Sequence, residues 1–189
     1  HAVGDAAIDA YVSAVEHIGT PEVWRQKRPR IEHGDMMSPD LIARVKRAGM
    51  VVVQNPIHFM LADMFVPRLG RDRMAWMEPM KSLLDAGVPL AIGTDGPLNP
   101  FVQIIGAITH PANPKEAISR EQAVTAYTAG SAFAEFQEKD KGQLAIGKLA
   151  DLAILSADVF TVPVEQLESI RSEMTMLGGK VVHQSGAVR

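Results

Sequence analysis

The order of apolar and polar residues predicts short buried strands that alternate with helices over the first 110 residues. Residues 50–53 and 88–92 are continuous apolar runs, which are typical of strands buried on both faces. Residues 28–34 form a third strand candidate, and residues 1–5 are interpreted as the end of a fourth strand. Turn-forming residues follow these segments, so we expect the chain to change direction there.

Helices are expected where apolar residues recur every three or four positions. Asp5 is predicted to cap the first helix, and Ser38 is predicted to cap the second. Ser119 and Gln122 form a capping-box sequence before a later helix. Residues 59–76 are expected to be an irregular but apolar segment that folds over another part of the protein. The predicted helices are 6–18, 39–48, 78–86, 103–108 and 119–127, with another turn or two at 132–137.

Alternating strands and helices imply parallel strands joined by right-handed crossovers. A complete (β/α)₈ barrel needs about 250 residues, and only four strand positions are visible. We therefore predict an α/β fold that is half of such a barrel. After residue 138 the pattern changes to short apolar runs between glycine turns, including residues 152–155 and 180–183. We place a domain boundary there, with a partial barrel over 1–138 and a small β-element over 139–189.

Composition narrows the classes of function. The 189 residues carry a net charge of −3 and no basic block interleaved with aromatic residues, so nucleic acid is not an expected partner. No apolar run approaches the roughly 20 residues needed to cross a bilayer, so no membrane partner is expected. The absence of cysteine excludes disulfides, thiolate metal sites and a cysteine nucleophile. The absence of cysteine also fits a reducing compartment, and the cytoplasm is favoured. A homo-oligomer is left open.

The predicted strand ends carry the candidate chemistry. His1, His33 and Asp95 each follow a strand position, and Gln54 and His58 follow another. Because parallel strands end at the same edge of a sheet, we expect His1, His33 and Asp95 to lie on one face. Imidazole and carboxylate groups together are a usual ligand set for Zn²⁺, or for Fe and Mn. The structural alternative is that Asp95 is a turn residue or a helix cap and that the histidines only pack. The pattern alone leaves both interpretations open.

Five segments resemble the amidohydrolase superfamily, most closely its amidohydrolase-3 (YtcJ-like) group of metal-dependent hydrolases. The two most specific segments are 93–97, which resembles the eighth-strand motif, and 141–152, which resembles the return of the chain to a small β-sandwich domain. The other three resemble the fifth-, sixth- and seventh-strand motifs. They are His1-Ala2-Val3-Gly4-Asp5, Arg30-Ile31-Glu32-His33 and Gln54-Asn55-Pro56-Ile57-His58.

This resemblance implies strands five to eight of a barrel plus part of the β-sandwich, and it implies roles for four residues. His1 and His33 would bind a divalent metal together with Asp95, which would also be the catalytic general base. His58 would contact the substrate. The implied cofactor is Zn²⁺, as one or two ions, with Fe or Mn as alternatives. The implied reaction is hydrolysis of a non-peptide C–N bond in a small-molecule amide, N-substituted formamide or cyclic amide by metal-activated water.

The chain also departs from the family pattern. The strand-one His-x-His pair and the strand-four ligand would lie upstream of His1, so we interpret the chain as a fragment with an incomplete site. Thr94 replaces the commoner serine, and Asn55 changes the spacing to His58. On its own, the chain is expected to be inactive and to aggregate or dimerise through open strand edges. The alternatives are a non-catalytic remnant, an interaction module, or an α/β binding domain whose strand-end residues only cap and turn.

Overall fold

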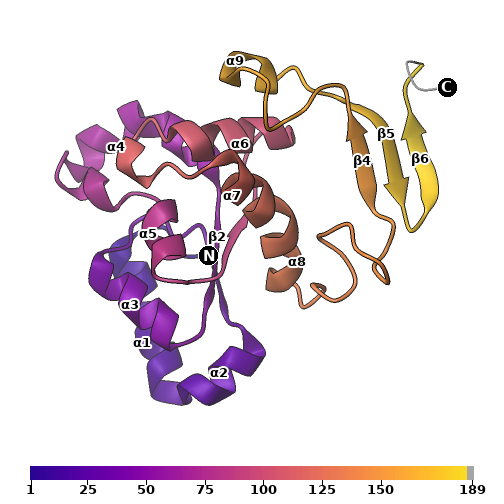
Figure 1. The fold of residues 1–189 in the computed structure, drawn as a ribbon. Helices are drawn as coiled ribbons and strands as arrows, with labels where there is room; N and C mark the ends of the chain where they lie inside the picture. Colours follow the sequence, from indigo (N-terminus) through magenta and orange to yellow (C-terminus); the bar gives the residue numbers. More distant parts are fainter. Residues whose placement is uncertain (187–189) are drawn as a thin grey trace.

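The computed structural model describes residues 1–186, except for the side chain of Ala62. Two sheets organise the chain, one parallel and one antiparallel, each with three strands. Figure 1 shows the antiparallel sheet standing to one side of the parallel sheet and its helices. The predicted α/β class is confirmed, and so is the change of architecture along the chain.

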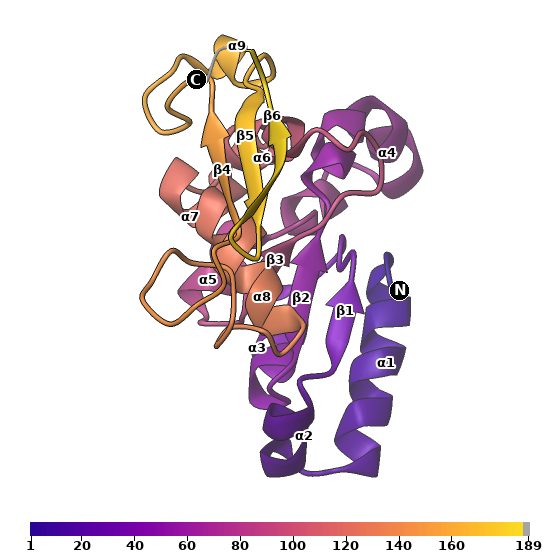
Figure 2. The ribbon, with the colours of Figure 1, turned by 90° about the vertical axis from the view of Figure 1, so that its right-hand side faces the viewer.

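The parallel sheet contains β1 (Arg30–Glu32), β2 (Val51–Gln54) and β3 (Leu90–Ile92), in the order β1-β2-β3. The three strands run side by side in Figure 2. The predicted fourth strand position is a single parallel bridge between Ala2 and His33. The parallel arrangement is therefore confirmed, although its first position is reduced to one bridge among the described residues.

Strands β2 and β3 are buried on both faces of the parallel sheet, which explains why these two strands lack alternation. Ile31, Val52 and Leu90 pair across the sheet and belong to the main hydrophobic core. Val51 and Ala91 instead belong to a smaller cluster with residues of α8. Helices thus pack on both sides of this sheet. The helices that contribute buried residues to these two clusters include α1 (Asp5–Ile18), α3 (Pro39–Arg47), α5 (Met80–Asp85), α6 (Pro100–Thr109) and α8 (Ser131–Ala134).

A π-helical turn, η4 (Ala126–Gly130), lies directly against β3. Its last residue, Gly130, packs on the strand backbone so closely that a Cβ atom there would lie 2.3 Å from the Leu90 carbonyl oxygen. The next residue, Ser131, donates a hydrogen bond from its hydroxyl to the Ile92 carbonyl. The absence of a side chain at residue 130 is therefore what allows this approach.

Two of the three predicted helix caps are present. The Ser38 side chain accepts a hydrogen bond from the Leu41 N–H, and Ser119 and Gln122 form a complete capping box before α7 (Arg120–Thr125). The prediction for Asp5 is wrong, because Gly4 is the N-cap and Asp5 is the first helical residue. A carboxylate is favourable in the first helical turn, and that of Asp5 pairs with Arg73.

Two helical regions differ from the predictions. The short helix α2 (Pro21–Lys27) follows α1 directly, and residues 59–76 are largely helical where we expected an irregular segment. The second region contains η1 (Pro56–Leu61), α4 (Ala62–Leu69) and η2 (Arg73–Trp76). Its apolar residues form a separate small cluster, and this packing gives the segment a fixed structure. The members of that cluster are Met36, Phe65, Val66, Leu69, Met74, Met77 and Ala112.

The C-terminal region forms the antiparallel sheet. Strands β4 (Leu152–Leu155), β5 (Ser172–Leu177) and β6 (Lys180–Gln184) lie in the order β4-β5-β6. The predicted strands at 152–155 and 180–183 are confirmed, whereas β5 was not foreseen because polar residues interrupt its apolar ones. The described residues make a single layer here, not a sandwich. The boundary at residue 138 stays a prediction, and residues 187–189 of the second predicted domain lie outside the described residues.

Several contacts join the C-terminal region to the helices around the parallel sheet. Leu167 of α9 (Val164–Leu167) belongs to the main core. The Arg120 guanidinium, at the start of α7, donates to the Val159 and Val162 carbonyls. A short turn, η3 (Pro114–Glu116), completes the helical elements of the described residues. Within residues 1–186, no helix combines the length and apolar character needed to cross a membrane.

Candidate functional site

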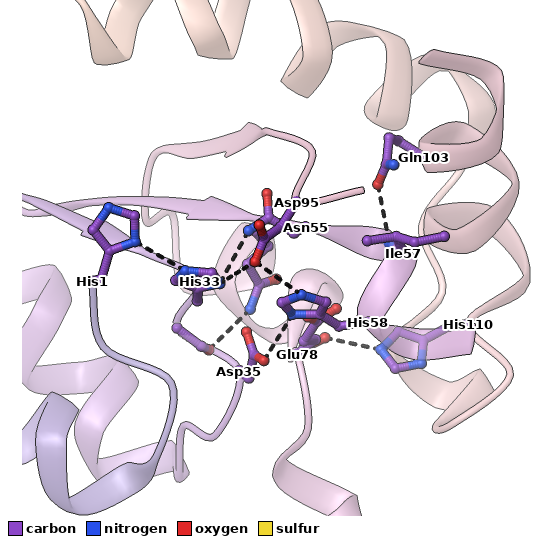
Figure 3. Close-up of polar contacts among 12 residues, drawn as sticks. His1, His33, Asp35, Asn55, Ile57, His58, Glu78, Asp95, Gln103 and His110 are labelled. Carbon is purple, nitrogen blue, oxygen red and sulfur yellow. Dashed lines mark hydrogen bonds and ion pairs between the residues drawn. The ribbon is translucent and has the colours of Figure 1, made fainter. Parts of the chain in front are cut away.

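The carboxyl ends of the parallel strands bring polar side chains to one rim of the sheet (Figure 3). His33 follows β1, His58 lies beyond β2, and Asp95 follows β3. His1 joins them because the bridge between Ala2 and His33 holds the first residues beside β1. The structure thus brings His1, His33 and Asp95 together, while their chemical roles stay a prediction.

His33 lies at the centre of this group. Its Nε2 atom is 3.0 Å from Nδ1 of His1. On the other side of the ring, Nδ1 is 3.2 Å from the Asn55 amide nitrogen and 3.9 Å from Oδ2 of Asp95. The φ angle of His33 is +76°, a conformation uncommon for residues other than glycine. A hydrogen bond from its backbone N–H to the Val53 carbonyl helps to hold the residue there.

His58 stacks on His33 and contacts three carboxyl groups. The two imidazole rings are nearly parallel, with centroids 5.5 Å apart and planes 5° apart. Nδ1 of His58 donates to Oδ2 of Asp35 at 3.0 Å and lies 3.5 Å from Oε1 of Glu78. Nε2, at the opposite edge of the ring, is 3.5 Å from Oδ2 of Asp95. The ring therefore separates two buried carboxyl groups from the more exposed one.

Burial and charge shift the ionisation of this cluster. The Asp35 carboxylate, which accepts the Nδ1–H of His58, and the nearby Glu78 carboxyl group raise the pKa of His58 to about 10. Desolvation raises the pKa of the Glu78 carboxyl well above its ordinary value, because the side chain is fully buried. This shift favours the imidazolium form of His58, whose positive charge lies beside Asp35 and Glu78.

Gln103 links the two loops that carry His58 and Asp95. Its side chain is fully buried on α6. The amide oxygen accepts a hydrogen bond from the Ile57 N–H, and the amide nitrogen donates to the Thr94 hydroxyl, both at 3.0 Å. One amide thus fixes the residues immediately before His58 and Asp95, and Figure 3 shows its contact with Ile57.

Asp95 is the accessible carboxylate of the group. Its side chain is 59% exposed, so it contributes little to the core. The helix that follows is capped by Asn99, whose side chain accepts the Phe101 N–H. The alternative that Asp95 caps this helix is therefore wrong. The carboxylate remains free to meet a molecule that enters from solvent.

Comparison with known proteins agrees with the rim geometry. A sequence model of the amidohydrolase family matches residues 1–183. The chain belongs to the amidohydrolase family. It is 30% identical to YtcJ of Bacillus subtilis over 198 residues, which covers 97% of this chain and 37% of YtcJ. It is 26% identical to the N-substituted formamide deformylase of Arthrobacter pascens, covering 95% of this chain and 35% of that enzyme.

The solved structures include close counterparts of this amidohydrolase chain. The crystal structure of a metal-dependent hydrolase from Pyrococcus horikoshii superposes with a TM-score of 0.77 and 27% sequence identity. The match covers 87% of this chain and 35% of that structure. The amidohydrolase chain therefore spans a little over a third of the length of these relatives.

The rim of this amidohydrolase chain contains residues that the sequence did not point to. Asp35 lies only two positions after His33, so the strand-end motif itself could have indicated it. Glu78 and Gln103 gave no such signal. Glu78 follows a long helical connection, and Gln103 sits on the apolar face of a helix. Only the folded structure brings them to His58.

Two sets of donor atoms at this rim have the chemistry of cation ligands. The first is the His1 and His33 nitrogen pair, with Asp95 nearby. Zn–N bonds of about 2.0–2.1 Å place two nitrogens of a tetrahedral site about 3.3 Å apart, close to the 3.0 Å between these atoms. The second set consists of His33, Asp35 and His58, whose donor atoms lie within 4.8 Å of one another.

Proposed function

We propose that the full-length protein is a metal-dependent hydrolase that cleaves non-peptide C–N bonds. The substrates would be small-molecule amides, N-substituted formamides or cyclic amides. Membership of the amidohydrolase family supports this reaction class, and so does the likeness to an N-substituted formamide deformylase and to a metal-dependent hydrolase. The observation that carries the proposal is the meeting of His1, His33 and the accessible Asp95 at one rim.

The same proposal includes the place of this chain in the whole enzyme. Its parallel strands and the Ala2 bridge would be strands five to eight of a (β/α)₈ barrel, and the β4–β6 sheet would be part of a small β-sandwich. In such barrels the catalytic residues come from the carboxyl ends of several strands. This is the end at which the candidate residues lie.

The residues present fit a divalent metal. His1 and His33 would hold it through the facing nitrogens Nδ1 and Nε2, and Asp95 would complete the contribution of this chain. We expect Zn²⁺, as one or two ions, with Fe or Mn as alternatives, since imidazole and carboxylate ligands suit all three. When bound, such an ion lowers the pKa of a water molecule and polarises a substrate carbonyl.

The remaining chemistry falls to the side chains of this chain. Asp95 would accept a proton from the attacking water and deliver it to the amine that leaves. Its exposure allows both transfers, because substrate can approach the carboxylate directly. His58 would contact the substrate through Nε2, the nitrogen on the Asp95 side of its ring. The amide group of Gln103 would keep these two residues at a fixed separation.

The test uses the full-length protein. Its metal content is measured by plasma mass spectrometry, and release of amine is followed with an N-substituted formamide, a simple amide and a cyclic amide. We expect at least one equivalent of metal and turnover of one of these classes that disappears after chelation and returns with Zn²⁺. A protein that binds metal without hydrolysing any of them, or that binds none, would instead be a non-catalytic remnant or a binding module.

A further inference from the structure

The buried carboxyl group of Glu78 lacks the partners that such a group normally has. Its side chain is fully buried, and neither of its oxygens accepts a hydrogen bond. Oδ1 of Asp35 is in the same condition. Buried carboxyl oxygens without hydrogen bonds are costly and rare. Three such oxygens, from two carboxyl groups beside one imidazole, therefore require an explanation other than the stability of the fold.

The backbone holds Glu78 firmly in this costly position. Its N–H donates to the Asp35 carbonyl, and its carbonyl accepts a hydrogen bond from Nε2 of His110 at 3.0 Å. His110 is itself buried and stacks on Phe59, the residue after His58, with ring centroids 3.9 Å apart. The φ angle of Glu78 is +42°. A strained residue tied down on both sides is typical of a functional constraint.

The carboxyl groups of Asp35 and Glu78 both face the same edge of the His58 ring. Nδ1 faces Asp35 at 3.0 Å and Glu78 at 3.5 Å, so Nε2 must face the opposite way, toward Asp95. The hydrogen bond to Asp35 therefore fixes which edge of the ring faces inward.

We propose that Asp35 and Glu78 are positioning residues that act through His58. They fix the ring with Nδ1 inward and with Nε2 facing Asp95 and the reacting group of the substrate. This role rests on the function proposed above. Asp35 supplies the direct hydrogen bond, and Glu78 excludes the flipped ring by placing a second acceptor beside the same nitrogen. Neither residue touches the substrate.

The test compares Asp35→Asn and Glu78→Gln with Glu116→Gln in the full-length holoenzyme. Glu116 is a matched control, because its carboxylate accepts two hydrogen bonds from Ser82 away from the rim. We expect kcat to fall about 10–100-fold in the two positioning variants, as for other outer-shell partners of a site. KM and metal content should stay unchanged, and the Tm of Glu78→Gln should stay equal or rise. Glu116→Gln should lower Tm and leave kcat unchanged.

A second readout does not depend on turnover. In protein labelled with [¹⁵N]histidine, the His58 signals are identified by their loss in His58→Gln. We expect Nδ1 to carry a proton in the wild type and the His58 signals to change in both positioning variants but not in Glu116→Gln. If no substrate is turned over yet these signals change, the proposed function fails and the positioning role stands. Unchanged signals, kcat within twofold of wild type, or loss of a metal equivalent in Glu78→Gln would each overturn the inference.

Discussion

The Nδ1 atom of His1 lies 3.0 Å from the Nε2 atom of His33, although 32 positions separate the two residues. Parallel strand geometry produces this approach, because Ala2 pairs with His33 as a neighbouring strand would. These two imidazole nitrogens are the ones proposed above as metal ligands, and their separation suits that role.

Replacing His33 with alanine in the full-length protein should lower the metal content before any other property. Loss of an outer-shell partner typically weakens metal affinity by about 10–100-fold. Loss of a direct ligand should weaken it more. Metal stoichiometry and kcat are measured on the same preparations. His17→Ala is the control, since His17 is exposed on α1. Full metal content in His33→Ala would remove His33 from the ligand set.

Asp95→Asn should abolish turnover while the fold stays intact and metal binding is at least partly retained. Asparagine has the same size but cannot accept a proton from water, and loss of a general base typically costs about 10²–10⁴ in rate. Because the Asp95 side chain is 59% exposed, the substitution should not disturb the packing of the core. Rates, metal content and circular dichroism are compared with wild type. Near-normal kcat would mean that Asp95 is a turn residue after all.

Gly130→Ala should destabilise the protein even though alanine is the better helix former by about 1 kcal/mol. The added methyl group would meet the Leu90 carbonyl at 2.3 Å, so η4 and β3 must separate. Overpacking of this kind typically costs about 1–3 kcal/mol, which should appear as a lower Tm. Gly186→Ala is the control, because nothing lies within 4 Å of that position. Equal Tm values for the two variants would contradict the predicted overlap.

The ion pair between Arg28 and Glu138 should make stability depend on acid pH. The guanidinium makes two hydrogen bonds to the carboxylate and lowers the pKa of Glu138 from 4.5 to about 2. A carboxyl group whose pKa is depressed in the folded protein stabilises the fold at pH values above its ordinary pKa. This contribution is lost as the pH falls toward 2. Glu138→Gln should therefore lower Tm at pH 7 and have little effect near pH 2. A difference that persists unchanged at low pH would rule out the ionic contribution.

The parts of the fold that were predictable from sequence are those with local signals. The runs at residues 50–53 and 88–92 are apolar without alternation because both faces of the sheet are buried. The N-cap at Ser38 and the capping box at Ser119 are local hydrogen bonds, so the sequence alone indicates them. By contrast, β5 mixes polar and apolar residues although it is the central strand of a partly exposed sheet, and it carries no continuous apolar run.

The candidate site likewise contains residues that the sequence could predict and residues that it could not. His1, His33 and Asp95 could be predicted to meet because each follows a strand and parallel strands end together. Glu78 could not be predicted, because its place depends on how residues 56–77 fold and pack before the chain returns to the sheet. Long-range packing of this kind leaves no periodic signal in the sequence.

Gln103 spans two loops with a single amide group, and both of its hydrogen bonds are needed to satisfy a fully buried side chain. An insertion or deletion in either loop would break one of these bonds and leave a buried polar atom unpaired, at a cost of about 1–3 kcal/mol. The lengths of the loops before His58 and Asp95 should therefore change only together during evolution. Variation that alters substrate preference is expected to accumulate instead in residues 59–77, which the amide of Gln103 does not bind.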